Sequence, residues 1–264
     1  MTSRLASRFA EMQSAKRGGL VAYVTAGDPD GERSASVLAA VARGGADVIE
    51  VGVPFSDPLA DGPVIQRASE RALAAGMTLT GSLALIREFR QSFDTPIVLF
   101  TYANPVVRMD AEVFARAAKT AGVDGVLLLD YPVEEAEPLR RPLVDAGLDP
   151  IFLISPTTTD DRIRRSAELG GGFLYVISRL GVTGTRDALS GDVGPLLARV
   201  RALSSLPVAV GFGISRPAMV AEACRYADAA VVGSALVQEI ATHAGAPDLA
   251  SRVENYVAWL KSDL

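Results

Sequence analysis

The chain has very few residues of the kinds that form disulfides, metal sites and Schiff bases. Its 264 residues include one Cys (Cys224), one His (His243) and three Lys (Lys16, Lys119 and Lys261). One Cys excludes an intrachain disulfide and a Cys-rich metal site, and one His cannot build a His-rich metal site. We therefore expect no metal in this chain, and any catalysis must use carboxylates, Tyr, Ser, Thr or backbone groups.

Basic charge and long apolar runs are also lacking. The net charge is -5 and the pI is near 5.1, so no basic surface argues for nucleic acid. The apolar runs are well short of a membrane span. The N-terminus, MTSRLASRFAEMQ, carries charges where a signal peptide needs an apolar core. With 49% hydrophobic and 22% charged residues, the composition is that of a globular protein, and we expect a cytoplasmic location.

Apolar runs of strand length alternate with helix-period segments along the whole chain. The predicted strands cover 19–25, 47–52, 96–101, 125–129, 149–154, 173–177, 207–211 and 229–232. The predicted helices cover 2–14, 31–44, 63–75, 79–92, 110–121, 134–146, 159–169, 192–204, 215–226, 234–243 and 247–262. Because the strands are continuously apolar, they indicate a parallel sheet that helices cover on its outer face.

These strand–helix units predict an α/β fold, a (β/α)8 TIM barrel with an extra N-terminal helix and additional helices. No linker rich in Pro, Gly or Ser divides the chain, so we expect residues 1–264 to form a single barrel domain. The competing fold is a doubly wound open sheet. The first predicted strand is followed by TAGDPDGE (25–32) rather than a G-x-G-x-x-G nucleotide-binding turn, which favours the barrel.

A carboxylate lies within the second predicted strand, in VIEVGVPFSDPLADGP (48–63). Side chains alternate along a strand, so Glu50 points into the barrel while Ile49 and Val51 face the helices. A buried Glu is either paired structurally or works as a general acid/base whose pKa burial raises. Asp61 follows in the loop, where it either acts in the site or caps a helix or turn.

Two further acids lie near the same barrel end. Asp57 precedes Pro58 and reads as a turn residue. Asp130 ends the fourth predicted strand, where a loop hydrogen bond and a role at the reactive end are both open.

The second half of the chain has glycine-rich loops after three consecutive predicted strands: SRLGVTGTR (178–186), GFGIS (211–215) and GSAL (233–236). Glycine permits close backbone approach, and Ser234 starts a helix whose N–H groups favour an anion. Barrels often bind phosphate with the loops after strands 7 and 8. We therefore predict a phosphate pocket, although tight turns alone would need the same glycines.

Apolar and aromatic residues lie at strand ends between these two halves. Most such residues are plain core, but beside a phosphate site and a strand Glu they indicate a pocket for a flat apolar group. They are Tyr23, Phe100, Tyr102, Leu129, Leu153, Tyr175 and Phe212.

The chain resembles the tryptophan synthase alpha subunit family over nearly its whole length. The matching segments, in the family's order, are IEVGVPFSDPLADGP (49–63), TYANP (101–105), DYPVEE (130–135), SRLGVTGTR (178–186), GFGIS (211–215) and GSA (233–235). The resemblance implies a lyase of L-tryptophan biosynthesis that cleaves indole-3-glycerol phosphate into indole and glyceraldehyde 3-phosphate. This retro-aldol reaction uses no cofactor and no metal.

The resemblance also implies roles for individual residues. Glu50 matches the general acid/base that protonates indole C3, Asp61 matches the carboxylate that binds the indole N–H, and Tyr175 matches the tyrosine beside Glu50. The matched phosphate contacts are Gly184, Gly213, Gly233 and Ser234. The matched indole pocket is Phe100, Tyr102, Thr183 and Phe212, with Tyr23, Leu129 and Leu153 at positions where the family varies.

A partner is implied in the same way. The family subunit binds a beta subunit that carries pyridoxal phosphate and consumes the indole, in an alpha2beta2 heterotetramer with transfer of indole between sites. The family's contact loops match Pro54, Asp57 and Pro132. Some relatives release indole alone, so a stand-alone lyase stays open.

The chemical requirements of carbon–carbon cleavage agree with this resemblance. Carbon–carbon cleavage needs an electron sink, usually a Lys Schiff base or a metal, and all three Lys lie in predicted helices or terminal segments. A protonated substrate ring is an alternative sink, for which two carboxylates suffice. Two other hypotheses stay open: a different phosphate-sugar barrel enzyme such as an isomerase, and a non-catalytic regulatory barrel that binds phosphate.

Overall fold

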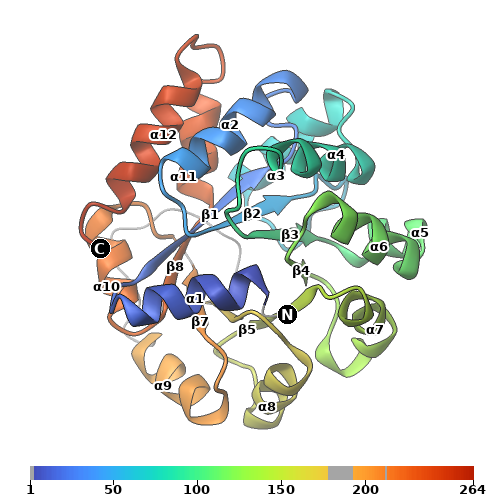
Figure 1. Cartoon of the computed structure of the whole chain (residues 1–264), viewed down its shortest axis with the longest axis vertical. Helices are drawn as coiled ribbons and strands as arrows, with labels where there is room; N and C mark the ends of the chain where they lie inside the picture. Colours follow the sequence, from blue (N-terminus) through green and yellow to red (C-terminus); the bar gives the residue numbers. More distant parts are fainter. Residues whose placement is uncertain (1–2, 178–192, 212) are drawn as a thin grey trace.

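The computed structural model describes residues 3–177, 193–211 and 213–264. Within them, eight parallel strands close into a barrel in sequence order, and β8 pairs with β1 (Figure 1). The strands are β1 (Gly19–Thr25), β2 (Val48–Gly52), β3 (Ile97–Thr101), β4 (Gly125–Leu128), β5 (Asp149–Ile154), β6 (Leu174–Ile177), β7 (Val208–Gly211) and β8 (Ala229–Val232). The predicted (β/α)8 barrel is confirmed, and the open-sheet alternative is wrong.

Helices surround the barrel as the outer layer (Figure 1). They are α1 (Arg4–Ser14), α2 (Gly31–Arg43), α3 (Pro63–Ala74), α4 (Leu79–Phe89), α5 (Ala103–Met109), α6 (Ala111–Ala121), η1 (Val133–Glu135), α7 (Glu137–Asp145), α8 (Asp160–Leu169), α9 (Val193–Leu203), α10 (Pro217–Cys224), α11 (Ser234–Thr242) and α12 (Leu249–Leu260). Among the described helices and strands, α5 is the one that the sequence did not predict. Across the described ranges, every helix is too short or too polar to cross a membrane.

Two separate apolar clusters follow from the alternation of side chains along the strands. Residues such as Ile49, Val51 and Leu99 belong to the cluster between the strands and the helices. Their neighbours Val48 and Val98 belong to the barrel interior. Glu50 lies on the interior face, in register with Tyr23 of β1 and Val98 of β3, as the alternation predicted.

Helix α1 covers the N-terminal end of the barrel and crosses the opening in Figure 1. Its buried side chains Leu5, Phe9 and Met12 belong to the interior cluster. At the start of β1, a Cβ added to Gly19 would lie 2.3 Å from Met12 Sδ, so glycine is required for this close approach. Helix α1 thus fills this end of the described barrel, and the opposite end, at the carboxyl ends of the strands, is where barrel active sites lie.

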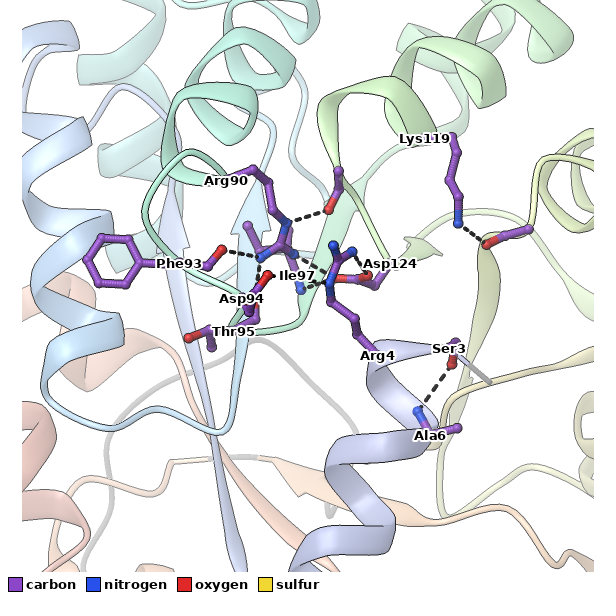
Figure 2. Close-up of polar contacts among 12 residues, drawn as sticks. Ser3, Arg4, Ala6, Arg90, Phe93, Asp94, Thr95, Ile97, Lys119 and Asp124 are labelled. Atoms are coloured by element: carbon purple, nitrogen blue, oxygen red, sulfur yellow. Dashed lines mark hydrogen bonds and ion pairs between the residues drawn. The ribbon is translucent and has the colours of Figure 1, made fainter. Parts of the chain in front are cut away.

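Ion pairs fix α1 and α4 to the start of β4 (Figure 2). The buried carboxylate of Asp124 accepts hydrogen bonds from Arg4 Nη1 at 3.0 Å, from Arg90 Nη2 at 2.6 Å and from the Ile97 backbone N–H at 2.8 Å. Arg90 also donates to the carbonyl oxygen of Thr95 at 2.6 Å. A buried carboxylate is stable only with such partners, and here they connect two helices with two strands.

Candidate active site

A cavity of about 450 Å³ opens at the carboxyl ends of the strands. Most of its walls are apolar or aromatic, and its polar groups come from opposite sides of the barrel. The lining residues among those described are Tyr23, Glu50, Leu59, Ala60, Asp61, Ile65, Phe100, Leu129, Leu153, Tyr175, Ile177, Gly213, Ile214, Val231, Gly233, Ser234 and Ala235. A largely apolar pocket with a few convergent polar groups is the usual form of a small-molecule site.

Glu50 occupies the floor of this cavity, with 1% of its surface exposed. Its Oε1 has no hydrogen-bond partner among the described residues. Burial disfavours the charged carboxylate and raises the pKa of Glu50 from 4.5 to about 8. The alternative of a structural Glu held by an ion pair finds no support in the described part of the chain, where Glu50 forms no salt bridge. Glu50 is therefore protonated at neutral pH.

Asp61 lines the same cavity from the loop between β2 and α3. Burial raises its pKa to about 6, while a hydrogen bond from the Tyr102 hydroxyl to Oδ2 at 3.0 Å opposes the rise. Its side chain does not cap α3, because Gly62 is the N-cap residue and no side chain caps this helix. Asp61 is therefore mostly ionised at neutral pH, in contrast to Glu50.

Two tyrosines flank Glu50 and lean across neighbouring strands. Tyr23 extends over Gly52 of β2, where an added Cβ would lie 2.1 Å from its hydroxyl oxygen. Tyr175 extends over Gly211 of β7, where an added Cβ would lie 2.6 Å from its hydroxyl oxygen. Burial and the negative charge of nearby carboxylates raise the pKa of both phenols. Both hydroxyls therefore stay protonated and can donate hydrogen bonds.

The opposite wall has the features of an anion site. Gly213, Gly233 and Ser234 all line the cavity. Ser234 is the first residue of α11, and Gly233 is its N-cap. Helix N-termini present free N–H groups and a positive dipole end to an anion. Gly213 has a φ of 71°, a conformation that favours glycine over residues with a side chain.

The other residues singled out from the sequence fall into three groups. Phe100, Leu129 and Leu153 line the cavity between the carboxyls and α11. Tyr102 lies behind Asp61, outside the set of lining residues. Thr183, Gly184 and Phe212 lie outside the described residues.

The loops expected to contact a partner differ in exposure. Asp57 and Pro132 are exposed, whereas Pro54 is buried. Asp57 accepts a hydrogen bond from the Ser56 hydroxyl at 2.5 Å, which fits its reading as a turn residue. Asp130 accepts a hydrogen bond from the Ala103 N–H at 2.7 Å, and it therefore caps the start of α5.

The sequence reasoning missed several residues of this site. Ile177 and Val231 line the cavity, and the alternation that places Tyr175 inside the barrel also predicts Ile177. Ile65 lies in the first turn of α3, just after the loop that carries Asp61. The contact between Tyr102 and Asp61 joins residues 41 positions apart and carried no local signal.

The described residues contain no cluster of three or more His, Cys, Asp and Glu side chains suited to a metal ion. The three lysines lie away from the cavity. Lys119 donates to the Gly147 carbonyl oxygen, Lys261 pairs with Asp47, and Lys16 is exposed at the end of α1. The reactive groups of the described site are carboxyls, phenols and backbone N–H groups.

The closed barrel, with buried carboxyls in a cavity at the carboxyl ends of its strands, defines a (β/α)8-barrel enzyme. Comparison with known proteins identifies the family. The profile of the tryptophan synthase alpha chain family matches residues 9–262, and the chain belongs to this family. It is accordingly a lyase subunit of tryptophan biosynthesis.

Individual relatives agree with this assignment. The tryptophan synthase alpha chain of Burkholderia thailandensis is 48% identical, covering 98% of this chain and 96% of its own. That of Cupriavidus taiwanensis is 52% identical over 238 residues, or 89% of each chain. Among solved structures, tryptophan synthase from Mycobacterium tuberculosis superposes with a TM-score of 0.92 at 35% identity, covering 100% of this chain and 98% of that chain. The alpha subunit from Legionella pneumophila gives 0.90 at 35% identity, with the same coverage.

Proposed function

We propose that this chain cleaves indole-3-glycerol phosphate to indole and glyceraldehyde 3-phosphate, with Glu50 as general acid/base and Asp61 as the charge-stabilising carboxylate. The observation that carries the proposal is the contrast between two carboxyls in one cavity. Burial raises the pKa of Glu50 to about 8 and that of Asp61 to about 6. At a pH between these two values, Glu50 holds a proton that it can donate and Asp61 holds a negative charge. Such a separation of two pKa values indicates the acid and base roles.

The reaction follows from these two protonation states. Glu50 donates its proton to C3 of the indole ring, and the positive charge that develops at the ring nitrogen is stabilised by the carboxylate of Asp61. The resulting Glu50 carboxylate removes the proton from the glycerol hydroxyl next to the ring. The carbon–carbon bond breaks, its electrons restore the aromatic ring, and the hydroxyl carbon becomes the aldehyde. Glu50 ends the cycle protonated, as it began.

Substrate orientation is supported by the two-sided cavity. The phosphate is held by the N-terminus of α11 with Gly213, Gly233 and Ser234. The indole ring lies among Tyr23, Phe100, Leu129 and Leu153. The family resemblance adds Gly184 to the phosphate contacts and Tyr102, Thr183 and Phe212 to the indole pocket. Tyr175 donates a hydrogen bond beside Glu50.

The chain works with a beta subunit that contains pyridoxal phosphate and receives indole directly from this cavity, in an alpha2beta2 assembly. The exposed Asp57 and Pro132 belong to its contact loops. This chain itself supplies no cofactor.

Glu50→Gln tests the proposal directly. We expect indole release from indole-3-glycerol phosphate to fall by at least ~10²-fold, since a general acid/base is removed. Asp61→Asn should also lower the rate while leaving glycerol 3-phosphate binding intact, because it acts on the opposite side from the phosphate. Glu88→Gln, an exposed carboxyl on α4, is the matched control and should keep the wild-type rate. A Glu50→Gln enzyme with a normal rate would overturn the mechanism.

The alternatives give different outcomes in the same assay. Binding of glycerol 3-phosphate without any indole release would favour a regulatory barrel, and turnover of another phosphate sugar would favour an isomerase. Adding a purified beta subunit tests the partner: we expect faster indole release and a heterotetramer by analytical ultracentrifugation. Full activity of the isolated chain, with no assembly, would identify a stand-alone lyase.

A further inference from the structure

The hydroxyl group of Tyr102 lies between the backbone and the side chain of the loop that carries Asp61. It accepts a hydrogen bond from the Ala60 N–H at 3.1 Å and donates one to Asp61 Oδ2 at 3.0 Å. The direction of the first bond is determined because an amide N–H can only donate, and that of the second because an ionised carboxylate can only accept. The single hydroxyl proton of Tyr102 is therefore directed at the carboxylate of Asp61.

One contact holds the phenol ring of Tyr102, and another holds the backbone next to it. The Phe55 ring, from the loop after β2, stacks on it with centroids 4.9 Å apart and planes at 28°. Behind it, Asp130 accepts a hydrogen bond from the N–H of Ala103, the residue that follows Tyr102. Tyr102 is 4% exposed. It thus connects the loop after β2 to the ends of β3 and β4.

The surroundings of Asp61 show why its hydrogen bond from Tyr102 matters. The titratable side chains that feel its charge are Tyr23 of β1, Tyr102 and Tyr175 of β6, and Glu50 of β2 lines the same cavity. None of these is a cation, and Asp61 takes part in no ion pair within the described ranges. Over the same ranges, Tyr102 is the one side chain that donates a hydrogen bond to its carboxylate.

We propose that Tyr102 is a positioning residue, which keeps Asp61 ionised and holds one carboxylate oxygen so that the other is free for the substrate. The proposal rests on the function proposed above, because it assigns how Asp61 is prepared for its role. Its physical basis is that hydrogen bonds to a charged carboxylate stabilise that form. Burial favours the neutral acid, and Tyr102 opposes that effect from a fixed position.

Tyr102→Phe is the test, since it removes the hydroxyl and keeps the ring that stacks on Phe55. A lost hydrogen bond to a charged group raises the carboxyl pKa by about one unit or more. The acid limb of the kcat/KM profile should therefore move to higher pH. Relative to wild type, the variant should lose about fivefold more activity at pH 6 than at pH 8, as the ionised fraction requires. The alkaline limb and glycerol 3-phosphate binding should stay unchanged.

A direct measurement accompanies the kinetics. Carboxyl carbon NMR titration of protein labelled at Asp, with Asp61→Asn to assign the signal, reports the pKa of Asp61 without any turnover. Tyr226→Phe, which alters an exposed tyrosine outside the site, is the matched control and should leave the profile as in wild type. A loss of rate by one factor at every pH, with an unmoved carboxyl signal, would overturn the positioning role.

The two proposals fail in distinguishable ways. If Glu50→Gln abolishes indole release but Tyr102→Phe leaves the acid limb in place, only the role of Tyr102 is refuted. If Glu50→Gln retains the wild-type rate, the proposed function fails whatever Tyr102→Phe does. A Tyr102→Phe chain that does not fold would refute the claim that the ring contacts hold this loop without the hydroxyl.

Discussion

The buried carboxyl of Glu50 should make the stability of this protein fall as pH rises. Glu50 is 1% exposed, and its Oε1 has no hydrogen-bond partner in the described residues. Its pKa in the folded state, about 8, lies above its ordinary value of 4.5 because burial penalises the charge. The folded protein therefore holds a proton that the unfolded chain has released throughout the interval between these two values.

The size of the effect follows from linkage. In the interval between 4.5 and about 8 the folded state binds more protons than the unfolded state, so the free energy of unfolding decreases with pH. At 1.36 kcal/mol per pKa unit, the whole interval corresponds to about 5 kcal/mol. The part of this change that falls between about pH 5 and about pH 8.5 is about 3–5 kcal/mol. The stabilising contribution is complete below pH 4.5 and is lost as pH rises through about 8.

Glu50→Gln isolates this contribution, because the amide has the shape of the acid and does not ionise. Urea unfolding of both proteins at about pH 5 and about pH 8.5 gives the two free energies from midpoint and slope. All other groups titrate equally in both proteins and cancel in the difference. Between these two pH values, the free energy of unfolding of the wild type should fall by about 3–5 kcal/mol more than that of the variant.

The control is Glu88→Gln, whose carboxyl is exposed on α4. Its free energy of unfolding should change with pH as that of the wild type does. If the pH-dependent change for Glu50→Gln also matched that of the wild type to within about 1 kcal/mol, the carboxyl of Glu50 would be hydrated or paired in the folded protein. The acid role that rests on its burial would then be refuted. Because this assay needs no substrate, it tests the electrostatics separately from the reaction.

Three further outcomes follow from the site and the barrel. The kcat/KM for indole release should rise with pH as Asp61 ionises near 6 and fall as Glu50 ionises near 8; a profile without an alkaline limb would contradict this. Gly52→Ala should lower stability by about 1–3 kcal/mol through overpacking against Tyr23, and Tyr23→Leu in the same chain should restore most of it in urea unfolding. Asp124→Ala should lower the free energy of unfolding by about 3–5 kcal/mol, since it leaves the largely buried Arg90 without its charged partner; a loss below about 1 kcal/mol would refute the pairing.

Much of the site could be predicted from the sequence, because successive side chains of a strand point to opposite faces. Alternation alone placed Glu50 inside the barrel and Ile49 and Val51 outside, as the two apolar clusters confirm. The ends of successive strands meet at one rim, so residues far apart in sequence were expected in one cavity. Glycine and serine after the last strands likewise indicated where α11 begins.

Other features were not readable because their cause lies elsewhere in the chain. Helix α5 starts at Ala103 without a local capping side chain, and its cap comes from Asp130, 27 residues later. The pairing of Tyr102 with Asp61, 41 positions apart, was hidden for the same reason. Local propensity describes a residue by its neighbours in sequence, whereas these contacts depend on the order in which strands close the barrel.

One long-range pattern is nevertheless encoded at the start of alternate strands. Asp47, Asp124 and Asp228 directly precede β2, β4 and β8. Each accepts, through its carboxylate, the backbone N–H of a residue at the start of the preceding strand: Leu20, Ile97 and Val208, at 2.8–2.9 Å.

Before β6 the corresponding backbone hydrogen bond comes from Gly171, three residues ahead of Leu174. Its N–H donates to the carbonyl oxygen of Pro150, as the N–H of Asp47 donates to the carbonyl oxygen of Leu20. Proline has no N–H to offer a carboxylate, so an Asp there would have no such backbone donor to accept. Where the donor exists, the carboxylate fixes the register of two strands. For β2 that register determines whether Glu50 faces the cavity or the helices. Asp47 at the closed end of the barrel thus helps to place Glu50 in the cavity at the open end.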